Sequence, residues 1–200
     1  MSAVMHDIVA AVEAALLPHP AVRAVELVGS RATGMPTPLS DWDLVVVTDR
    51  FDEVARALPA AVAELEPLAQ QWDRISAYPC YMLMLAGPVK VDLIFPDEPY
   101  ESLPPWSVSA ETLDGIDQHF WDWILWLASK RKKRQDELVR RELIKLRDHL
   151  LGPLGVDRVP SSIEAAVEAF RAARNERERE FGVEVSRRRE HEVLPVLPTG

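Results

Sequence analysis

The 200-residue sequence has a single cysteine, Cys80, and no long hydrophobic segment. One cysteine excludes an intrachain disulfide and is typical of a reducing compartment, so we expect a cytoplasmic protein. We interpret Cys80 as a buried spacer, because its neighbours Pro79 and Tyr81 give no sign of an activated thiolate. No apolar run approaches the ~20 residues of a membrane-spanning helix, so no membrane partner is expected. The N-terminus lacks the basic start of a signal peptide.

Positive charge and the signatures of several enzyme classes are also scarce. The formal net charge is -9 at pH 7, which argues against a nucleic-acid partner, since nucleic-acid-binding proteins usually have a basic face. The five histidines are scattered without the spacing of a metal site. The sequence contains no Gly-x-Ser-x-Gly and no glycine loop followed by a lysine, so it matches neither a serine hydrolase nor a P-loop protein.

The first hundred residues predict an α/β domain with a mixed sheet. Helical spacing of apolar residues predicts a first helix that ends before Pro18. Strands are expected at residues 22–28, 43–48, 77–87 and 89–95. A helix is expected from Glu53 to Leu68, with Asp49 or Asp52 as its N-cap and a kink at Pro59.

The remainder of the chain predicts an α-helical bundle domain. Four prolines between Pro96 and Pro105 indicate a linker and a boundary near residue 100. Helices are expected around residues 120–127, which are apolar nearly all round, at roughly 136–151, and after a capping box formed by Ser161 and Glu164. We therefore expect domains at residues 1–100 and 101–190, followed by a loose tail at 191–200.

Candidate chemistry lies at the start of the second strand. Asp41 and Asp43 flank Trp42, and residues two apart in a strand point the same way, so both carboxylates would face one side and Trp42 the core. Two close carboxylates repel each other unless both face water or share a cation. Asp92 supplies a third carboxylate if its strand lies beside that of Asp43, and two divalent ions could then bind. The alternatives are solvated turn acids and an Asp92 that pairs with Lys90 or an arginine.

The loop before these acids suits an anion. Gly29 and Ser30 end the preceding strand, and Gly34 follows them. A glycine there lets the backbone approach phosphate oxygens, which a serine hydroxyl can also bind. Arg31 either contacts a triphosphate or is solvated with the loop, and Ser40 is either a ligand or a turn former.

These elements together form a recognisable signature. Its parts, in chain order, are Gly29-Ser30-x-x-x-Gly34, then Ser40-Asp41-x-Asp43-Leu44, then Asp92. The signature covers about residues 24–95 and resembles that of the DNA polymerase β-like nucleotidyltransferase superfamily. With the helical region behind it, the chain is similar to the antibiotic (aminoglycoside and lincosamide) nucleotidyltransferases, which include antibiotic-resistance enzymes. One departure is Thr33, where many relatives have a larger basic or aromatic residue.

The resemblance implies a reaction and its site residues. Asp41, Asp43 and Asp92 would be the catalytic and metal-binding residues for two Mg²⁺ ions. Gly29 and Ser30, with Arg31 and Ser40 as further candidates, would bind the phosphates of ATP. AMP would pass from ATP to a hydroxyl group of a small-molecule acceptor such as an aminoglycoside-like antibiotic. Several antibiotic-modifying relatives take a second base from the helical domain, and the candidates here are Asp122, Glu137 and Glu142.

Three questions stay open at this level. The chain could instead be a protein-modifying (AMPylating) nucleotidyltransferase of the antitoxin type, although its added helical domain argues against this. It could also be a non-catalytic nucleotide-binding module, although all three acids are present. Some relatives form dimers with shared active sites, so a homodimer is a third open point.

Trp121, Trp123 and Trp126 could contact a ligand, but aromatic residues on a nearly all-apolar helix more often belong to the core.

Overall fold

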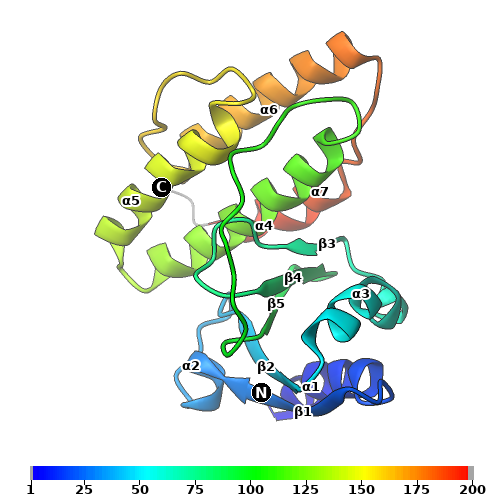
Figure 1. Ribbon diagram of the computed structural model, residues 1–200. Coiled ribbons are helices and arrows are strands. Elements are labelled where there is room, and N and C mark those ends of the chain that lie inside the picture. The colour runs from blue at the N-terminus through cyan, green and yellow to red at the C-terminus, as the bar shows by residue number, and fades with distance from the viewer. Residues whose placement is uncertain (1, 198–200) are drawn as a thin grey trace. The chain divides into compact units, whose positions relative to one another are not determined.

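The computed structural model describes residues 2–197 (Figure 1). Its contacts divide the chain into two compact units. The first unit comprises residues up to Ser102 apart from Thr37–Leu39, and the second comprises those three residues and the chain from Leu103 onward. Among the described residues, we find no helix with the length and apolar character needed to span a membrane.

The first unit is an α/β domain. Its elements are α1 (Ser2–Leu16), β1 (Val22–Val28), α2 (Gly29–Ala32), β2 (Trp42–Thr48), α3 (Phe51–Ala61), η1 (Ala63–Leu65), β3 (Ala69–Trp72), β4 (Cys80–Leu85) and β5 (Val89–Ile94). The five strands form one sheet in the order β1-β2-β5-β4-β3. Only the β2–β5 pair is parallel among these neighbours, so the predicted mixed sheet is confirmed.

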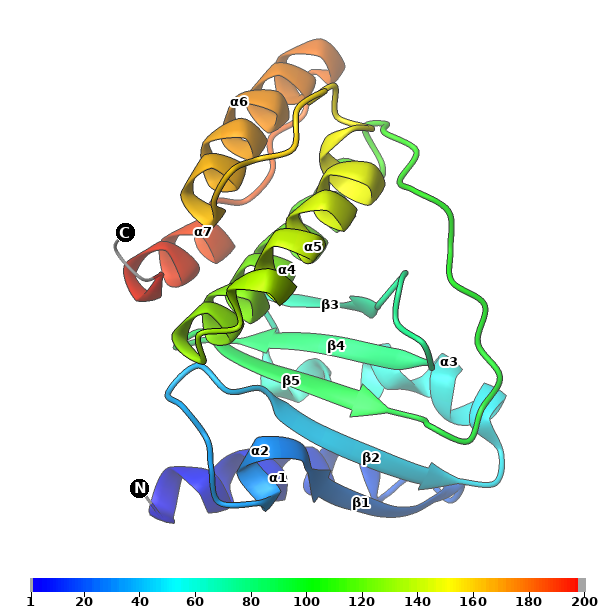
Figure 2. The same ribbon diagram turned by 90° about the vertical axis from the view of Figure 1, so that its left-hand side faces the viewer.

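One face of this sheet carries the core of the unit. Helices α1 and α3 cover that face, as Figure 2 shows. Trp42 and Leu44 of β2 pack in this core, where Trp42 is 3 % exposed, and this confirms the predicted orientation of Trp42. Because side chains alternate along a strand, Asp43 points to the opposite face.

Two expectations for this unit were wrong. The helix expected to reach Leu68 contains Pro59 in its last turn and ends at Ala61, where the chain tightens into the turn η1. Its N-cap is Arg50, without a side-chain cap, rather than Asp49 or Asp52. The chain then passes through η1 and the left-handed Glu66 into β3, a strand that the sequence pattern did not predict.

The second unit is helical. Its elements are α4 (Leu113–Lys132), α5 (Asp136–Leu146), a π-helical turn η2 (Arg147–Leu151), α6 (Ile163–Phe181), α7 (Arg188–Val193) and η3 (Leu194–Val196). Helix α4 contacts α5, α6 and α7. Trp121 and Trp123 are buried in the core, as predicted for this aromatic segment, whereas Trp126 is only half-buried, with the Lys130 ammonium 4.7 Å from the centre of its ring. The second helix, expected up to residue 151, leaves the α-helical pattern at Arg147. The N-cap of α6 is Ser162, which accepts a hydrogen bond from the Ala165 backbone N–H at 3.1 Å, and not the expected Ser161.

Helix α7 is held by buried ion pairs. The Arg174 guanidinium, 1 % exposed, donates to Asp117 at 2.8 Å and to Glu190 at 2.7 Å. Arg189 of α7 donates to the second oxygen of Asp117 at 2.7 Å. Where a loose tail is expected from residue 191, the chain is therefore helical as far as Val196, and Val193 is fully buried. Residues 198–200 of that tail lie outside the described residues.

Candidate active site

The pairing of β2 with β5 places two acids side by side. In this parallel pair Asp43 is the register partner of Asp92, and Trp42 is the partner of Val91. Residues paired in this way point to the same face, so both carboxylates lie on the face opposite to Trp42. The expected adjacency of the two strands is confirmed. Strand β5 lies between β2 and β4, so Asp92 is on a central strand rather than at an edge.

Three carboxylates converge at this point. One oxygen from each of Asp41, Asp43 and Asp92 lies within 4.8 Å of the other two, and we call these residues the carboxylate cluster. Asp41, just before β2, is 6 % exposed, whereas Asp43 and Asp92 are half-buried. Like charges so close and so little hydrated are unfavourable without a compensating cation. Carboxylate oxygens are also the ligands that Mg²⁺ prefers, so these residues fit a divalent ion.

Asp92 has a second interaction within its own strand. The Lys90 ammonium lies 2.6 Å from Asp92 Oδ1, with side-chain exposures of 7 % and 13 %. The sequence left two interpretations of Asp92 open, namely a member of the carboxylate cluster and a partner of Lys90. The structure shows both, since Asp92 belongs to the cluster and also pairs with Lys90.

Gly29 brings the backbone against the cluster. Its φ is +71°, a left-handed conformation that favours glycine, and a Cβ at this position would lie 2.1 Å from Asp43 Oδ2. The Asp43 carboxylate therefore occupies the space that any side chain would need. The corner expected at Gly29 and Ser30 is a single helical turn, α2, in which the carbonyl of Ser30 accepts hydrogen bonds from Met35 N–H and the Thr33 hydroxyl.

Arg31 fixes the segment that carries Asp41. Its Nε donates to the Ser40 carbonyl at 3.0 Å and to the Asp41 carbonyl at 3.1 Å, and Nη2 donates to the Ser40 carbonyl at 2.6 Å. The guanidinium carbon lies 4.0 Å from the centre of the Trp42 ring. Burial lowers the pKa of Arg31, and the charges of Asp41 and Asp43 oppose this change. The structure thus brings Arg31 and Ser40 together and gives Arg31 the contacts of a positioning residue, which sequence spacing did not reveal.

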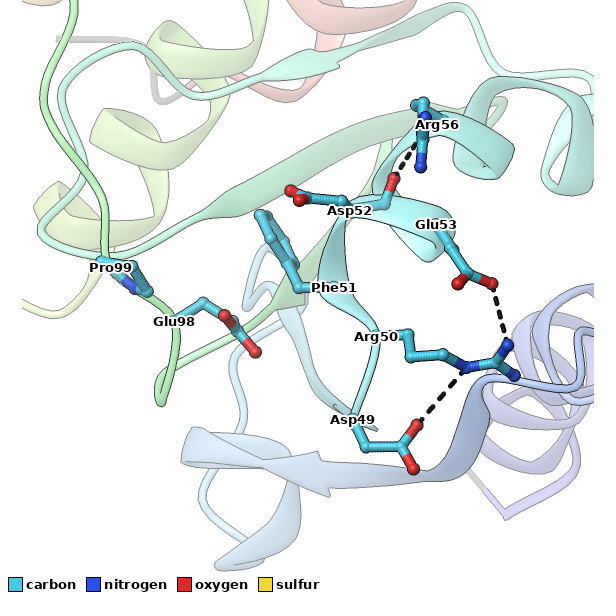
Figure 3. A pocket seen from close by; sticks show the side chains of 8 residues that line it. All are labelled: Asp49, Arg50, Phe51, Asp52, Glu53, Arg56, Glu98 and Pro99. Atoms are coloured by element: carbon cyan, nitrogen blue, oxygen red, sulfur yellow. Dashed lines mark hydrogen bonds and ion pairs between the residues drawn. The ribbon is translucent and has the colours of Figure 1, made fainter.

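A separate cavity lies beyond the other end of β2. It has a volume of about 560 Å³ and is lined by residues of the turn after β2, the first turns of α3, and Glu98 and Pro99 (Figure 3). Its charged side chains compensate one another, since Arg50 lies 3.8 Å from Asp49 and 3.0 Å from Glu53. No residue of the carboxylate cluster lines this cavity, and it has no evident chemistry.

The candidates for a second base all belong to the second unit. Asp122 of α4 is buried, and Glu137 lies in the first turn of α5. Glu142 of α5 is also buried and accepts a hydrogen bond from Lys145 at 2.7 Å.

A comparison with solved structures gives matches at low identity. The polymerase core of TRAMP, an RNA surveillance complex, is 13 % identical, with a TM-score of 0.39 over 62 % of this chain and 38 % of that chain. A cytoplasmic RNA terminal U-transferase is 16 % identical, with a TM-score of 0.37 over 66 % and 40 % of the two chains. An aminoglycoside 6-adenyltransferase from Bacillus subtilis is 10 % identical, with a TM-score of 0.32 over 94 % and 95 %. This chain thus spans less than two thirds of the two RNA-acting proteins, and these scores assign no substrate.

The family itself rests on a different comparison. No curated protein matches the sequence. The family model described as a nucleotidyltransferase domain matches residues 11–116, which is more than half of the chain and includes the whole carboxylate cluster. The chain therefore belongs to the nucleotidyltransferase domain family.

Proposed function

We propose that this nucleotidyltransferase transfers AMP from ATP to a hydroxyl group of a small acceptor such as an aminoglycoside-like antibiotic. The observation that carries the proposal is the convergence of Asp41, Asp43 and Asp92 within 4.8 Å beside Gly29. The acceptor class is supported by charge alone, since a net charge of -9 favours the approach of a cationic molecule.

Each site residue has a proposed task. The carboxylate cluster would hold two Mg²⁺ ions, which when bound supply the positive charge that neutralises the phosphates and the departing pyrophosphate. The backbone of Gly29 and the hydroxyl of Ser30 would bind β- and γ-phosphate oxygens. Arg31 would keep Asp41 in position through the carbonyls that it binds.

The proposed transfer is a single displacement. The acceptor hydroxyl oxygen forms a bond to the α-phosphorus of ATP, and the bond from that phosphorus to the pyrophosphate oxygen breaks. The hydroxyl proton passes to a carboxylate, for which Asp92 is our first candidate; a carboxylate of the second unit, Asp122, Glu137 or Glu142, is the alternative. Most of the rate enhancement then comes from orienting the two reactants in a site of fixed charge.

A transfer assay with α-labelled ATP and Mg²⁺ tests this proposal. The acceptors are a panel of aminoglycosides and lincosamides, and we expect label in the drug fraction. Label in a co-purified protein would instead support an AMPylating enzyme, and label in added RNA would support a nucleic-acid acceptor. Tight binding of Mg-ATP without any transfer would indicate a non-catalytic module.

Asp92→Asn tests the assigned site within that assay. We expect transfer to fall at least 100-fold, because loss of even an indirect partner of a metal site typically lowers metal affinity or activity about 10–100-fold. Asp97→Asn is the matched control, since it makes the same change at an exposed position of the first unit outside the carboxylate cluster. Equal rates for Asp92→Asn and Asp97→Asn would remove Asp92 from the site.

A further inference from the structure

A lysine ammonium lies at the carboxylate cluster. Lys90 and Asp92 are two residues apart on β5, so both side chains point to the face of the sheet that carries Asp43. The Lys90 Nζ lies 2.6 Å from Asp92 Oδ1, and the lysine side chain is only 7 % exposed. Such a buried ammonium is unfavourable unless a negative group compensates its charge.

The position of this ammonium matters for any ion that binds the cluster. The oxygens of Asp41, Asp43 and Asp92 concentrate three negative charges within 4.8 Å. Lys90 neutralises part of that charge through direct contact with one of the three carboxylates. A divalent ion that uses the same carboxylate must share it with the ammonium or displace the ammonium, and two cations this close repel each other.

We propose that Lys90 is a positioning residue that acts as an internal counter-ion of the carboxylate cluster. It holds Asp92 in place before an ion binds, and it competes with the ion for that carboxylate. Lys90 thus stabilises the ion-free protein and weakens the affinity of the cluster for a free divalent ion. The inference rests on the proposed function only in taking the cluster to be the site of a divalent ion.

Two effects of opposite sign separate this role from that of an ordinary structural ion pair. Removal of a purely structural pair lowers stability and either leaves ion affinity unchanged or weakens it, because the site becomes less ordered. Removal of a competing counter-ion lowers the stability of the ion-free protein and strengthens ion binding. Only the second outcome combines a less stable apoprotein with a tighter metal site.

The test measures Mn²⁺ binding to the full chain without nucleotide, by calorimetry or by the EPR signal of free Mn²⁺. For Lys90→Met we expect a dissociation constant at least about tenfold lower than in the wild type, together with a lower melting temperature in EDTA. Lys90→Arg retains the charge and should bind Mn²⁺ within about threefold of the wild type. Lys132→Met is the matched control, because it removes the same charge from an exposed position of α4 and should change neither quantity.

Unchanged or weaker Mn²⁺ binding by a cooperatively folded Lys90→Met protein would overturn the inference. If this variant is unfolded in EDTA, its melting temperature is followed as Mn²⁺ is added. A steeper rise than in the wild type then supports the inference, and no rise contradicts it. Tighter Mn²⁺ binding without any nucleotidyl transfer would refute only the proposed function, whereas transfer with Mn²⁺ affinity independent of Lys90 would refute only the inference.

Discussion

Gly29 and Gly34 have almost the same backbone conformation, with φ of +71° and +73°, but different surroundings. A Cβ on Gly29 would overlap Asp43 Oδ2, whereas a Cβ on Gly34 would have no heavy atom within 4 Å. Alanine at either position strains the left-handed backbone by about 1 kcal/mol. Only at Gly29 does it also displace a residue of the carboxylate cluster.

We therefore expect Gly29→Ala to destabilise the protein by about 2–4 kcal/mol and to weaken Mn²⁺ binding, because the Asp43 carboxylate must move. Gly34→Ala is the matched control and should lose only about 1 kcal/mol, with Mn²⁺ binding retained. Urea unfolding in EDTA and Mn²⁺ titration measure the two quantities. Equal Mn²⁺ affinities in the two variants would show that the contact with Asp43 does not matter for the site.

The sequence predicted which residues of the site would meet, but not what else they contact. Alternation along a strand was sufficient to place Asp43 opposite to Trp42, and the order of strands suggested Asp92 as a third acid. Whether Arg31 contacts a phosphate or only its own loop depends on the position of its guanidinium. Several rotatable bonds separate that group from the backbone, so the sequence does not determine this position. The contact of Lys90 with Asp92 was one of several pairings that the sequence allowed.

At the scale of elements, the segment between α6 and α7 depends on one carboxylate. Glu178 accepts hydrogen bonds from the Val185 backbone N–H at 2.7 Å and from two nitrogens of Arg187 at 2.7 and 2.5 Å. The bond from Arg187 is the main reason why the pKa of Glu178 lies below its ordinary value of 4.5. The stabilisation from Glu178 is therefore fully present above pH 4.5 and is lost as the pH falls through the lowered pKa.

We expect Glu178→Gln to lower the free energy of unfolding by about 2 kcal/mol at pH 7, because charged hydrogen bonds are replaced by weaker neutral ones. The difference from the wild type should shrink once the pH falls below 4.5. Urea unfolding at a series of pH values measures it. A difference that stays constant down to pH 3 would mean that the ionised carboxylate is not the stabilising form.

Elements with a strong apolar pattern were predictable, and those fixed by tertiary contacts were not. The run Asp43–Thr48 showed β2, but β3 has only four residues, two of them glutamines, and it becomes a strand by pairing with β4. The end of α3 was not predicted correctly, because the apolar residues after Pro59 favoured a longer helix than the structure has. The tail from residue 191 lacks an apolar pattern of its own, and α7 is held instead by the buried charges of Asp117, Arg174 and Glu190.

At the scale of the whole molecule, acidic residues outnumber basic ones. The chain has 32 acidic against 23 basic residues, and the carboxylate cluster brings three of its acids together. A divalent ion that binds this cluster in the folded state but not in the unfolded chain must stabilise the fold.

We expect Mn²⁺ at 100 times its dissociation constant to stabilise the protein by about 2.7 kcal/mol. This corresponds to a rise in melting temperature of roughly 10–20 °C where the first unit unfolds on its own, and of roughly 5–10 °C where the whole chain unfolds as one cooperative unit. Differential scanning calorimetry, with NaCl of matched ionic strength as the control, measures the shift. A similar rise when NaCl replaces Mn²⁺ would attribute the stabilisation to general screening of the net charge. A similar rise when Mn²⁺ is added to the double variant Asp41→Asn, Asp92→Asn would also exclude this site as its cause.

The parallel pairing of β2 with β5 also bears on where this chain can tolerate added sequence. Asp43 and Asp92 are register partners although α3, η1, β3 and β4 lie between them. Their alignment is set by the hydrogen bonds of the sheet, and doubling the length of a flexible turn between these intervening elements costs only about 0.6 kcal/mol. The segment from Gly29 to Asp41 has no such freedom, because Arg31 ties one end of it to the other. Insertions in the turns between these elements are therefore compatible with the alignment of Asp43 and Asp92, whereas changes in the loop before β2 must preserve the contacts of Arg31 with the Ser40 and Asp41 carbonyls.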